Sequence, residues 1–217
     1  MLQEILLQTK ARQALLIAVS KTQPVDRILL MYEQDQRNFG ENRAQEMLEK
    51  YEAMPKDIQW HLIGHLQTNK IKIIAPFVSL IHSVDSLRLL EEIDKQALKN
   101  NRTIDCLLQF HIAREESKFG LSEEEAFALL SSPSFKNMNN IRLCGVMGMA
   151  SFTDDADQIR KEFKQLYGIF ETLKARFFPD KPTFKEISMG MSGDWEIALQ
   201  EGSTMLRIGS LLFGNRV

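Results

Sequence analysis

The sequence has few cysteines and no long hydrophobic run, and these absences restrict the class of protein. Its two cysteines, Cys106 and Cys144, both lie in apolar segments, so they supply neither a disulfide framework nor a zinc site. The longest apolar runs, such as residues 14–19, reach about a third of the roughly 20 residues that span a bilayer. The N-terminal segment lacks the basic start and long apolar stretch of a secretory signal. We therefore expect a cytoplasmic protein that does not insert into a membrane.

Charge of one sign is not in excess either. The chain has 27 basic and 29 acidic residues, which gives a formal net charge of −2. This balance argues against nucleic acid or an anionic membrane surface as the main partner. The composition, with 44% hydrophobic and 26% charged residues, is that of a globular protein. The six prolines and eleven glycines form no linker, so we expect one domain over residues 1–217.

Short apolar segments alternate with amphipathic segments along the whole chain. Between the apolar segments, residues 25–32 and 163–177 have apolar side chains at helical spacing. Ser122 and Glu125 predict a capping box at the start of a further helix. Most of the apolar segments are continuous, as in parallel strands that are covered on both faces. Eight of them predict strands: 15–20, 37–40, 58–64, 78–83, 104–110, 141–148, 183–188 and 204–209.

This alternation predicts an α/β fold with a parallel sheet. Eight is the number of strands that closes a (β/α)₈ barrel, also called a TIM barrel. An open doubly wound sheet is the alternative, but no G-x-G-x-x-G fingerprint follows the first predicted strand. We therefore expect a single (β/α)₈ barrel, although the chain is short for that fold.

Lys21 is the first candidate for a functional residue. The functional site of such a barrel forms at the carboxyl ends of its strands, and Lys21 directly follows the first predicted strand. Burial of its stem in the barrel mouth would disfavour the charged ammonium form and make the amine nucleophilic toward a carbonyl group. The simpler alternative is a lysine that extends from a strand end into solvent.

Small residues after the seventh and eighth predicted strands are the second candidate feature. Barrels commonly hold phosphate at these two loops, and residues 188–193 and 209–210 are rich in glycine and serine. Their backbone N–H groups and the hydroxyls of Ser188, Ser192 and Ser210 are potential donors. Helices expected to begin near Ser192 and Ser210 would point their positive dipole ends inward. The alternative is a pair of tight turns in which Ser192 caps a helix.

A carbonyl-reactive lysine opposite a phosphate cradle suits pyridoxal 5'-phosphate. The aldehyde of this cofactor forms a Schiff base with lysine, and its phosphate anchors the other end. Arg207, in the eighth predicted strand, would then face the pyridine nitrogen. A permanent cation there keeps that nitrogen unprotonated and weakens the ring as an electron sink. Alternatively, Arg207 pairs with a carboxylate at the barrel rim.

Other residue clusters carry weaker signals. His61 and His65 form an H-x-x-x-H pair that straddles a strand end and lacks the glutamate of H-E-x-x-H, so we expect no metal site. Four methionines could line the pocket mouth, although core packing is the simpler interpretation. These are Met147, Met149, Met189 and Met191.

Six ordered motifs resemble the pyridoxal-phosphate homeostasis proteins, the YggS/PROSC family, over nearly the whole chain. They are AVSKT (18–22), FGEN (39–42), WHLIG with LQTNK (60–70), IHSVD (81–85), SMGMS (188–192), and RIGS with FG (207–214). The resemblance implies a barrel like the N-terminal domain of alanine racemase, with pyridoxal phosphate on Lys21. It also implies Asn42 near the cofactor, Arg207 at the ring nitrogen, and Ser192, Gly209 and Ser210 around the phosphate. The candidate cofactor-binding set is Lys21, Asn42, Ser188, Met189, Ser192, Arg207, Gly209 and Ser210.

Binding the cofactor does not by itself make an enzyme. Racemisation needs an acid or base on each face of the substrate α-carbon, and alanine-racemase-like enzymes take the second from a separate β-domain for which we expect no room here. We therefore expect a monomeric carrier of pyridoxal phosphate in vitamin B6 and amino-acid homeostasis, without robust catalysis, whose partners include apo-enzymes that require the cofactor. The alternatives are a racemase-like enzyme with Lys21 as one base and a cofactor-free Schiff-base aldolase.

Overall fold

Eight parallel strands close into a barrel in sequence order in the computed structural model of the chain. The structure describes residues 2–115 and 119–214. Each strand pairs with the next, and β8 pairs with β1 from Leu15↔Met205 to Ala18↔Ile208. This closure confirms the predicted (β/α)₈ barrel. The strands are β1 (Leu15–Val19), β2 (Asn38–Glu41), β3 (Gln59–Leu62), β4 (Leu80–Val84), β5 (Ile104–Phe110), β6 (Ile141–Gly148), β7 (Glu186–Ser188) and β8 (Met205–Ile208).

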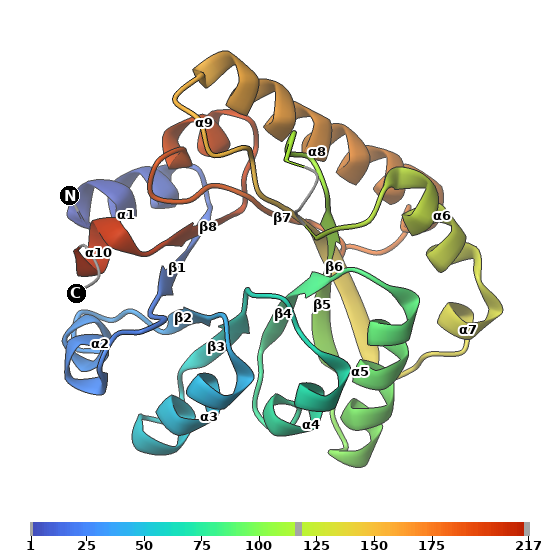
Figure 1. Ribbon diagram of the computed structural model, residues 1–217, viewed down its shortest axis with the longest axis horizontal. Coiled ribbons are helices and arrows are strands. Elements are labelled where there is room, and N and C mark those ends of the chain that lie inside the picture. Colours follow the sequence, from blue (N-terminus) through green and yellow to red (C-terminus); the bar gives the residue numbers. More distant parts are fainter. Residues whose placement is uncertain (1, 116–118, 215–217) are drawn as a thin grey trace.

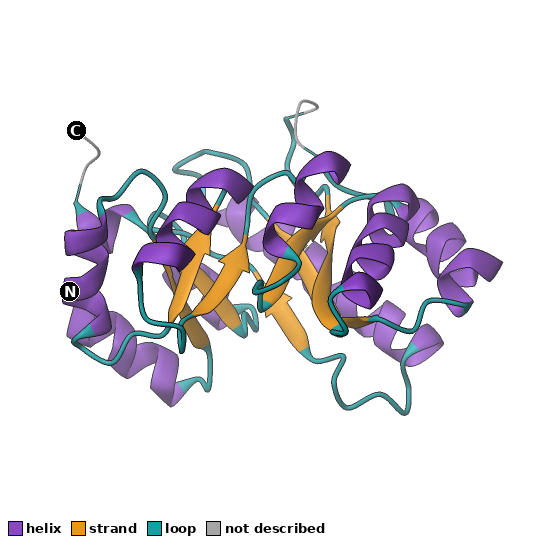
Figure 2. Ribbon diagram, turned by 90° about the horizontal axis from the view of Figure 1, so that it is seen from below, coloured by secondary structure: helices purple, strands orange, loops and turns teal. Residues whose placement is uncertain are grey.

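Helices surround the strands on all sides (Figures 1 and 2). The helix predicted from apolar spacing over residues 25–32 is observed as α2, and the capping box of Ser122 and Glu125 opens α6. None of the helices in the described ranges is long and apolar enough to cross a membrane. The helices are α1 (Leu2–Ala11), α2 (Val25–Tyr32), α3 (Ala44–Ala53), α4 (Ile71–Ile74), α5 (Leu87–Lys99), α6 (Glu123–Ser131), α7 (Pro133–Lys136), α8 (Ala156–Phe177), α9 (Trp195–Gln200) and α10 (Ser210–Phe213), with a 3₁₀ turn at Thr68–Lys70.

The seventh strand is shorter than the sequence predicts. The prediction began at residue 183, whereas β7 begins at Glu186. Residues 178–184 instead form turns in which Lys181 N–H donates to the Phe178 carbonyl and Phe184 N–H donates to the Lys181 carbonyl. Pro182, which has no N–H to give to a strand ladder, lies within this segment. The predicted strands 104–110 and 141–148 agree with β5 and β6.

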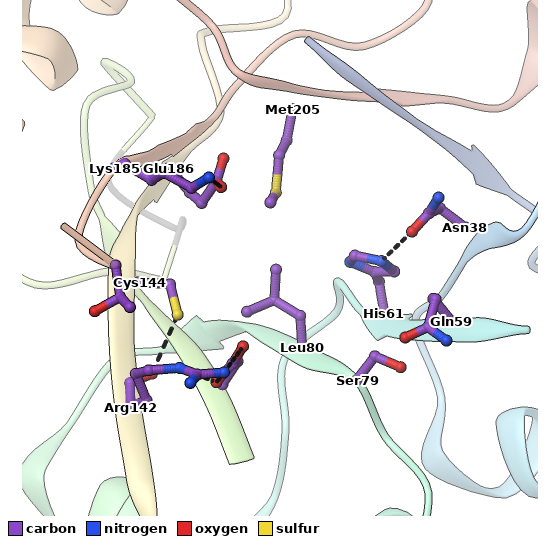
Figure 3. Close-up of a pocket in the computed structure, with 12 residues that line it drawn as sticks. Asn38, Gln59, His61, Ser79, Leu80, Arg142, Cys144, Lys185, Glu186 and Met205 are labelled. Atoms are coloured by element: carbon purple, nitrogen blue, oxygen red, sulfur yellow. Dashed lines mark hydrogen bonds and ion pairs between the residues drawn. The ribbon is translucent and has the colours of Figure 1, made fainter. Parts of the chain in front are cut away.

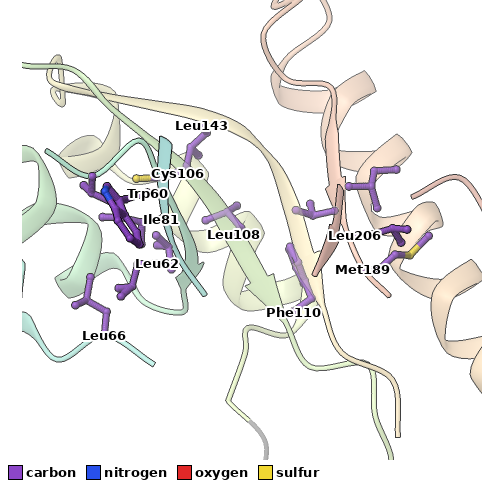
Figure 4. Packing of buried hydrophobic residues seen from close by; sticks show 14 of the residues in the cluster. Trp60, Leu62, Leu66, Ile81, Cys106, Leu108, Phe110, Leu143, Met189 and Leu206 are labelled. Carbon is purple, nitrogen blue, oxygen red and sulfur yellow. The ribbon is translucent and has the colours of Figure 1, made fainter. Parts of the chain in front are cut away.

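The buried side chains form two layers, one inside the barrel and one around it. Consecutive residues of a strand point to opposite faces, so Met205 joins the inner layer and Leu206 the outer one. The outer layer is the larger, and it packs the sheet against the helices (Figure 4). The apolar part of the inner layer consists of Ile17, Leu80, Leu107, Cys144, Met147 and Met205.

Candidate functional site

The predicted site residues lie at the ends of four neighbouring strands. Lys21 follows β1, Asn42 follows β2, and the others belong to β7, β8 and the segments after them. These strands are adjacent in the closed barrel, in the order β7, β8, β1, β2. Barrel closure therefore places residues from both ends of the chain on one arc of the carboxyl-terminal face.

Lys21 lies in a tight turn that is held on both sides. Ser20 N–H donates to the Gly40 carbonyl at 3.0 Å, and Thr22 N–H donates to Oε1 of Glu46 at 2.6 Å. Thr22 has φ of 64°, a left-handed conformation that is unfavourable for a β-branched residue. Lys21 itself is half-buried. The surrounding hydrogen bonds thus fix the backbone that carries the lysine.

A buried charge cluster lies beside this turn, and sequence reasoning missed it. The Lys50 ammonium contacts Glu41 at 2.8 Å and Glu46 at 2.7 Å, and it donates to the Ser20 carbonyl at 2.7 Å. Burial raises the pKa of Glu41 to about 7, against the opposing effect of Lys50. The i, i+4 spacing of Glu46 and Lys50 was the available signal, but their partner Glu41 comes from β2 and becomes a neighbour only in the fold.

Asn42 has a buried amide oxygen without a partner in the described part of the chain. Its Oδ1 atom is inaccessible to solvent and accepts no hydrogen bond. The loop after β3 packs directly on its backbone, because a Cβ atom on Gly64 would lie 2.5 Å from the Asn42 carbonyl oxygen. An unpaired buried acceptor costs about 1–3 kcal/mol, so a ligand that supplies a donor here would be stabilised.

The loops after β7 and β8 are joined at Ser192. Its Oγ accepts from the N–H groups of Gly209 at 3.3 Å and Leu211 at 3.5 Å. Ser192 is not a helix cap, since α9 begins three residues later and Asp194 occupies the N-cap position. α10 begins at Ser210 as expected, but it has only four residues, so its dipole is small. The anion-binding potential of this rim therefore rests on convergent N–H and hydroxyl groups, including the exposed Ser210.

Arg207 is buried below this rim. Its guanidinium donates from Nη1 to Ser188 Oγ at 2.6 Å and from Nη2 to the Gly148 carbonyl at 3.0 Å. Burial lowers the pKa of Arg207 to about 10, and Asp194 opposes that shift, so the side chain is cationic at neutral pH. Ser188, expected as a donor in the cradle, is engaged with Arg207 instead. Met189 packs its side chain in the outer core (Figure 4).

The two histidines of the H-x-x-x-H pattern, His61 and His65, lie in different surroundings. His61 lies inside the barrel and is 4% exposed, whereas His65 stacks on Phe119 and lies 3.3 Å from Oδ2 of Asp85. In the described ranges, no three metal-ligating side chains gather. The real partner of His61 is His82, whose Nε2 is 3.0 Å from Nδ1 of His61. This pairing across β3 and β4 was also missed, because the sequence separates the two residues.

A cavity of about 360 Å³ lies at the opposite, amino-terminal end of the barrel (Figure 3). Most of its lining residues are at or just before the first residues of strands, so this cavity is separate from the carboxyl-terminal arc. Leu80 and Met205 point into it, and His61 contacts Asn38 at its edge. The lining comprises Asn38, Gln59, His61, Ser79, Leu80, Asp105, Arg142, Cys144, Thr183, Lys185, Glu186 and Met205.

The fold and the arc of residues define the class of alanine-racemase-like barrels. The profile of the alanine racemase N-terminal domain matches residues 5–217. The pyridoxal phosphate homeostasis protein of Aquifex aeolicus is 39% identical over 204 residues, covering 94% of this chain and 87% of that protein. The human protein of the same name is 37% identical over 218 residues, covering 95% and 78%. The chain therefore belongs to the alanine racemase N-terminal domain family and, within it, to the pyridoxal phosphate homeostasis proteins.

Solved structures agree with this assignment. PipY of Synechococcus elongatus, determined with PLP bound, is 34% identical with a TM-score of 0.82, and the match covers 93% of each chain. Alanine racemase of Clostridium difficile has a TM-score of 0.71 at 13% identity, covering 99% of this chain and 60% of that one. The second likeness shows the shared fold alone.

Proposed function

We propose that this chain binds pyridoxal 5'-phosphate as a Schiff base on Lys21 and serves pyridoxal phosphate homeostasis. The observation that carries the proposal is the single arc on which Lys21, Asn42, Arg207 and the rim at Ser192 lie together. Curated relatives at 34–39% identity bear the name pyridoxal phosphate homeostasis protein, and PipY was solved with PLP bound. The unpartnered oxygen of Asn42 supports a polar ligand at this face.

Each residue of the arc has a role that suits its surroundings. The Lys21 amine would hold the aldehyde carbon, and the N–H and hydroxyl groups of Ser192, Gly209 and Ser210 would hold the phosphate. Arg207 would face the ring nitrogen. When bound, the cofactor supplies an electrophilic carbon and an electron-withdrawing ring. In this proposal Ser188 and Met189 support the site from behind, through Arg207 and through the outer core.

The chain acts as a carrier in this proposal rather than as a catalyst. A cationic Arg207 opposes a second positive charge on the ring nitrogen. An unprotonated ring withdraws electrons less strongly, and removal of a proton from the α-carbon of an amino acid depends on that withdrawal. The interior histidines are engaged with each other and with Ser188 and Asn38, so their ring nitrogens already have partners. We further propose a cytoplasmic monomer with one domain over residues 1–217 that passes its cofactor to apo-enzymes.

Reductive trapping tests the assignment of Lys21. Purified protein loaded with the cofactor should absorb visible light, and after borohydride treatment peptide mass mapping should place the reduced adduct on Lys21. Lys21→Ala should lose the trapped adduct completely while its melting temperature stays unchanged, because one half-buried lysine adds little to the core. Lys72→Ala, at an exposed position on α4, is the matched control. An adduct that maps to a different lysine in the wild type would refute the assignment.

Isotope exchange separates the carrier from the racemase alternative. The loaded protein is incubated with a panel of L-amino acids in deuterated water. We expect negligible α-deuteration and no steady formation of the D-isomer. Rapid α-deuteration that depends on Lys21 would instead support a racemase-like enzyme. A protein that shows neither colour nor trapped cofactor, yet cleaves a substrate carbon–carbon bond through Lys21, would favour the aldolase.

A further inference from the structure

A continuous chain of hydrogen bonds crosses the interior of the barrel. It starts at Arg207, whose Nη1 donates to Ser188 Oγ at 2.6 Å. Ser188 Oγ is 2.9 Å from Nδ1 of His82, and His82 Nε2 is 3.0 Å from Nδ1 of His61. This hydrogen-bonded path ends at Asn38, whose Oδ1 is 3.2 Å from Nε2 of His61. Five residues from five strands, β8, β7, β4, β3 and β2, thus form one connected path.

The donors in this path all point in one direction. A guanidinium can only donate, so Ser188 accepts from Arg207 and must place its own hydrogen elsewhere. In the described hydrogen bonds, the acceptor for that hydrogen is Nδ1 of His82. A neutral imidazole that accepts at Nδ1 carries its proton on Nε2, and His82 therefore donates to Nδ1 of His61. By the same reasoning His61 donates from Nε2 to Asn38.

Burial supports neutral imidazoles in this path. His82 is fully buried and His61 is 4% exposed. Burial lowers the pKa of both side chains, to about 4 for His61, and the positive charge of Arg207 acts in the same direction on His82. An imidazolium has no acceptor nitrogen, so a charge on either ring would break the path.

The two ends of the path lie at opposite ends of the barrel. Arg207 belongs to the carboxyl-terminal arc with Lys21, whereas Asn38 and His61 line the amino-terminal cavity (Figure 3). A hydrogen bond strengthens when its donor also accepts one, because neighbouring bonds polarise each other. A change at Asn38 is therefore transmitted through His61 to the buried His82, Ser188 and Arg207.

We propose that His82 and His61 are positioning residues that hold the Arg207 guanidinium against the cofactor site, and that Asn38 anchors them from the amino-terminal cavity. This inference rests on the proposed function, since it gives Arg207 a ligand to face. The role is indirect: neither histidine touches the cofactor in this proposal. It predicts that a substitution at the far end of the barrel changes the properties of bound pyridoxal phosphate.

The first experiment needs no cofactor. ¹⁵N-detected NMR of the apoprotein at pH 7 should show both His61 and His82 as neutral imidazoles with the proton on Nε2. Either ring with its proton on Nδ1, or charged, would contradict the direction of the path. This result stands whether or not the protein binds pyridoxal phosphate, so it separates this inference from the proposed function.

The second experiment measures the loaded protein. Asn38→Ala removes the terminal acceptor, and Gln59→Ala removes another amide from the same cavity that is outside the path. We expect Asn38→Ala to shift the visible absorption band and the ¹⁵N resonance of the ring nitrogen, and to weaken cofactor affinity about tenfold, as for one lost hydrogen bond. Gln59→Ala should leave all three unchanged. Equal spectra and affinities for Asn38→Ala and wild type would refute the positioning role.

A variant at the centre of the path completes the test. In His82→Asn, the amide oxygen can still accept from Ser188, but the link to His61 is lost. We expect its spectrum and affinity to match those of Asn38→Ala, because both variants cut the same path. A wild-type spectrum for a folded His82→Asn variant would also refute the proposal. If this variant does not fold, the comparison of Asn38→Ala with Gln59→Ala decides.

Discussion

The inside of the barrel and the layer around it differ sharply in chemistry. The outer layer contains large apolar side chains such as Trp60, Phe39 and Phe163, all fully buried. The inside combines a small apolar cluster with buried polar groups, among them Arg207 and His82. Along one strand, side chains of the outer layer and side chains of the inside alternate residue by residue.

This difference shows how one strand serves both stability and function. Trp60 and His61 are neighbours on β3, and Leu206 and Arg207 are neighbours on β8. Outward residues exclude water over a broad area, where packing volume matters more than direction. Inward polar residues each need a specific partner, because an unpaired buried polar group is costly. Substitutions in the two layers should therefore have different consequences, which three predictions test.

The largest effect is expected in the outer layer. Phe163→Ala should lower the free energy of unfolding by about 3–5 kcal/mol, the usual cost of removing a buried aromatic ring. Well below the melting temperature, its stoichiometry of cofactor binding should equal that of the wild type. Urea titration and absorption spectra measure the two properties. Lys164→Ala, exposed at the next position of α8, should change stability by less than about 0.5 kcal/mol. A fully stable Phe163→Ala would contradict the role given to the outer layer.

The inner layer should make the apoprotein sensitive to acid. His61 has a pKa of about 4 in the folded state and about 6.5 when unfolded, so the unfolded chain binds more protons between these values. Its contribution to stability is present above about pH 6.5 and is lost as the pH falls through about 4, a change of about 3 kcal/mol. Denaturant titrations from pH 7 to pH 4 should show a smaller loss of stability for His61→Gln than for wild type. His65→Gln is the control at a partly exposed site. Parallel curves for His61→Gln and wild type would show that His61 is not held neutral.

The smallest effect is expected at the rim. Ser192→Ala removes a hydroxyl from the cradle and should weaken pyridoxal phosphate binding by about 1–3 kcal/mol. Because Ser192 Oγ also accepts from the N–H groups of Gly209 and Leu211, binding is compared well below the melting temperature of the variant. Binding of pyridoxal, which has no phosphate, should be the same for variant and wild type. Calorimetric titration with both compounds provides the measurement. Ser134→Ala, on the distant α7, controls for loss of a serine hydroxyl. An equal loss for both compounds would remove the case for a phosphate cradle at Ser192.

Much of the fold could be predicted from the sequence because its signals are local. Continuous apolar runs indicated eight strands, and the spacing of Phe163, Leu166 and Phe170 indicated α8. The capping box at Ser122 was visible in four residues. The seventh strand was predicted too long, because apolar patterning does not show that the turns around Pro182 use the backbone groups of residues 178–184. Lys21, Asn42 and the rim were selected in the same local way, from their positions just after strands.

By itself the sequence determined the order of strands and helices, the lysine after the first strand, and the glycine–serine loops after the last two. These depend on residues close together in the chain. Only the tertiary structure decided which inward side chains meet. Asn38, His61, His82 and Ser188 are spread over 150 residues of sequence, and their pairing depends on strand register and closure of β8 onto β1. A hydrogen bond requires its two atoms to lie about 3 Å apart. Local sequence patterns do not specify such positions for distant residues, whereas the packing of the closed barrel does.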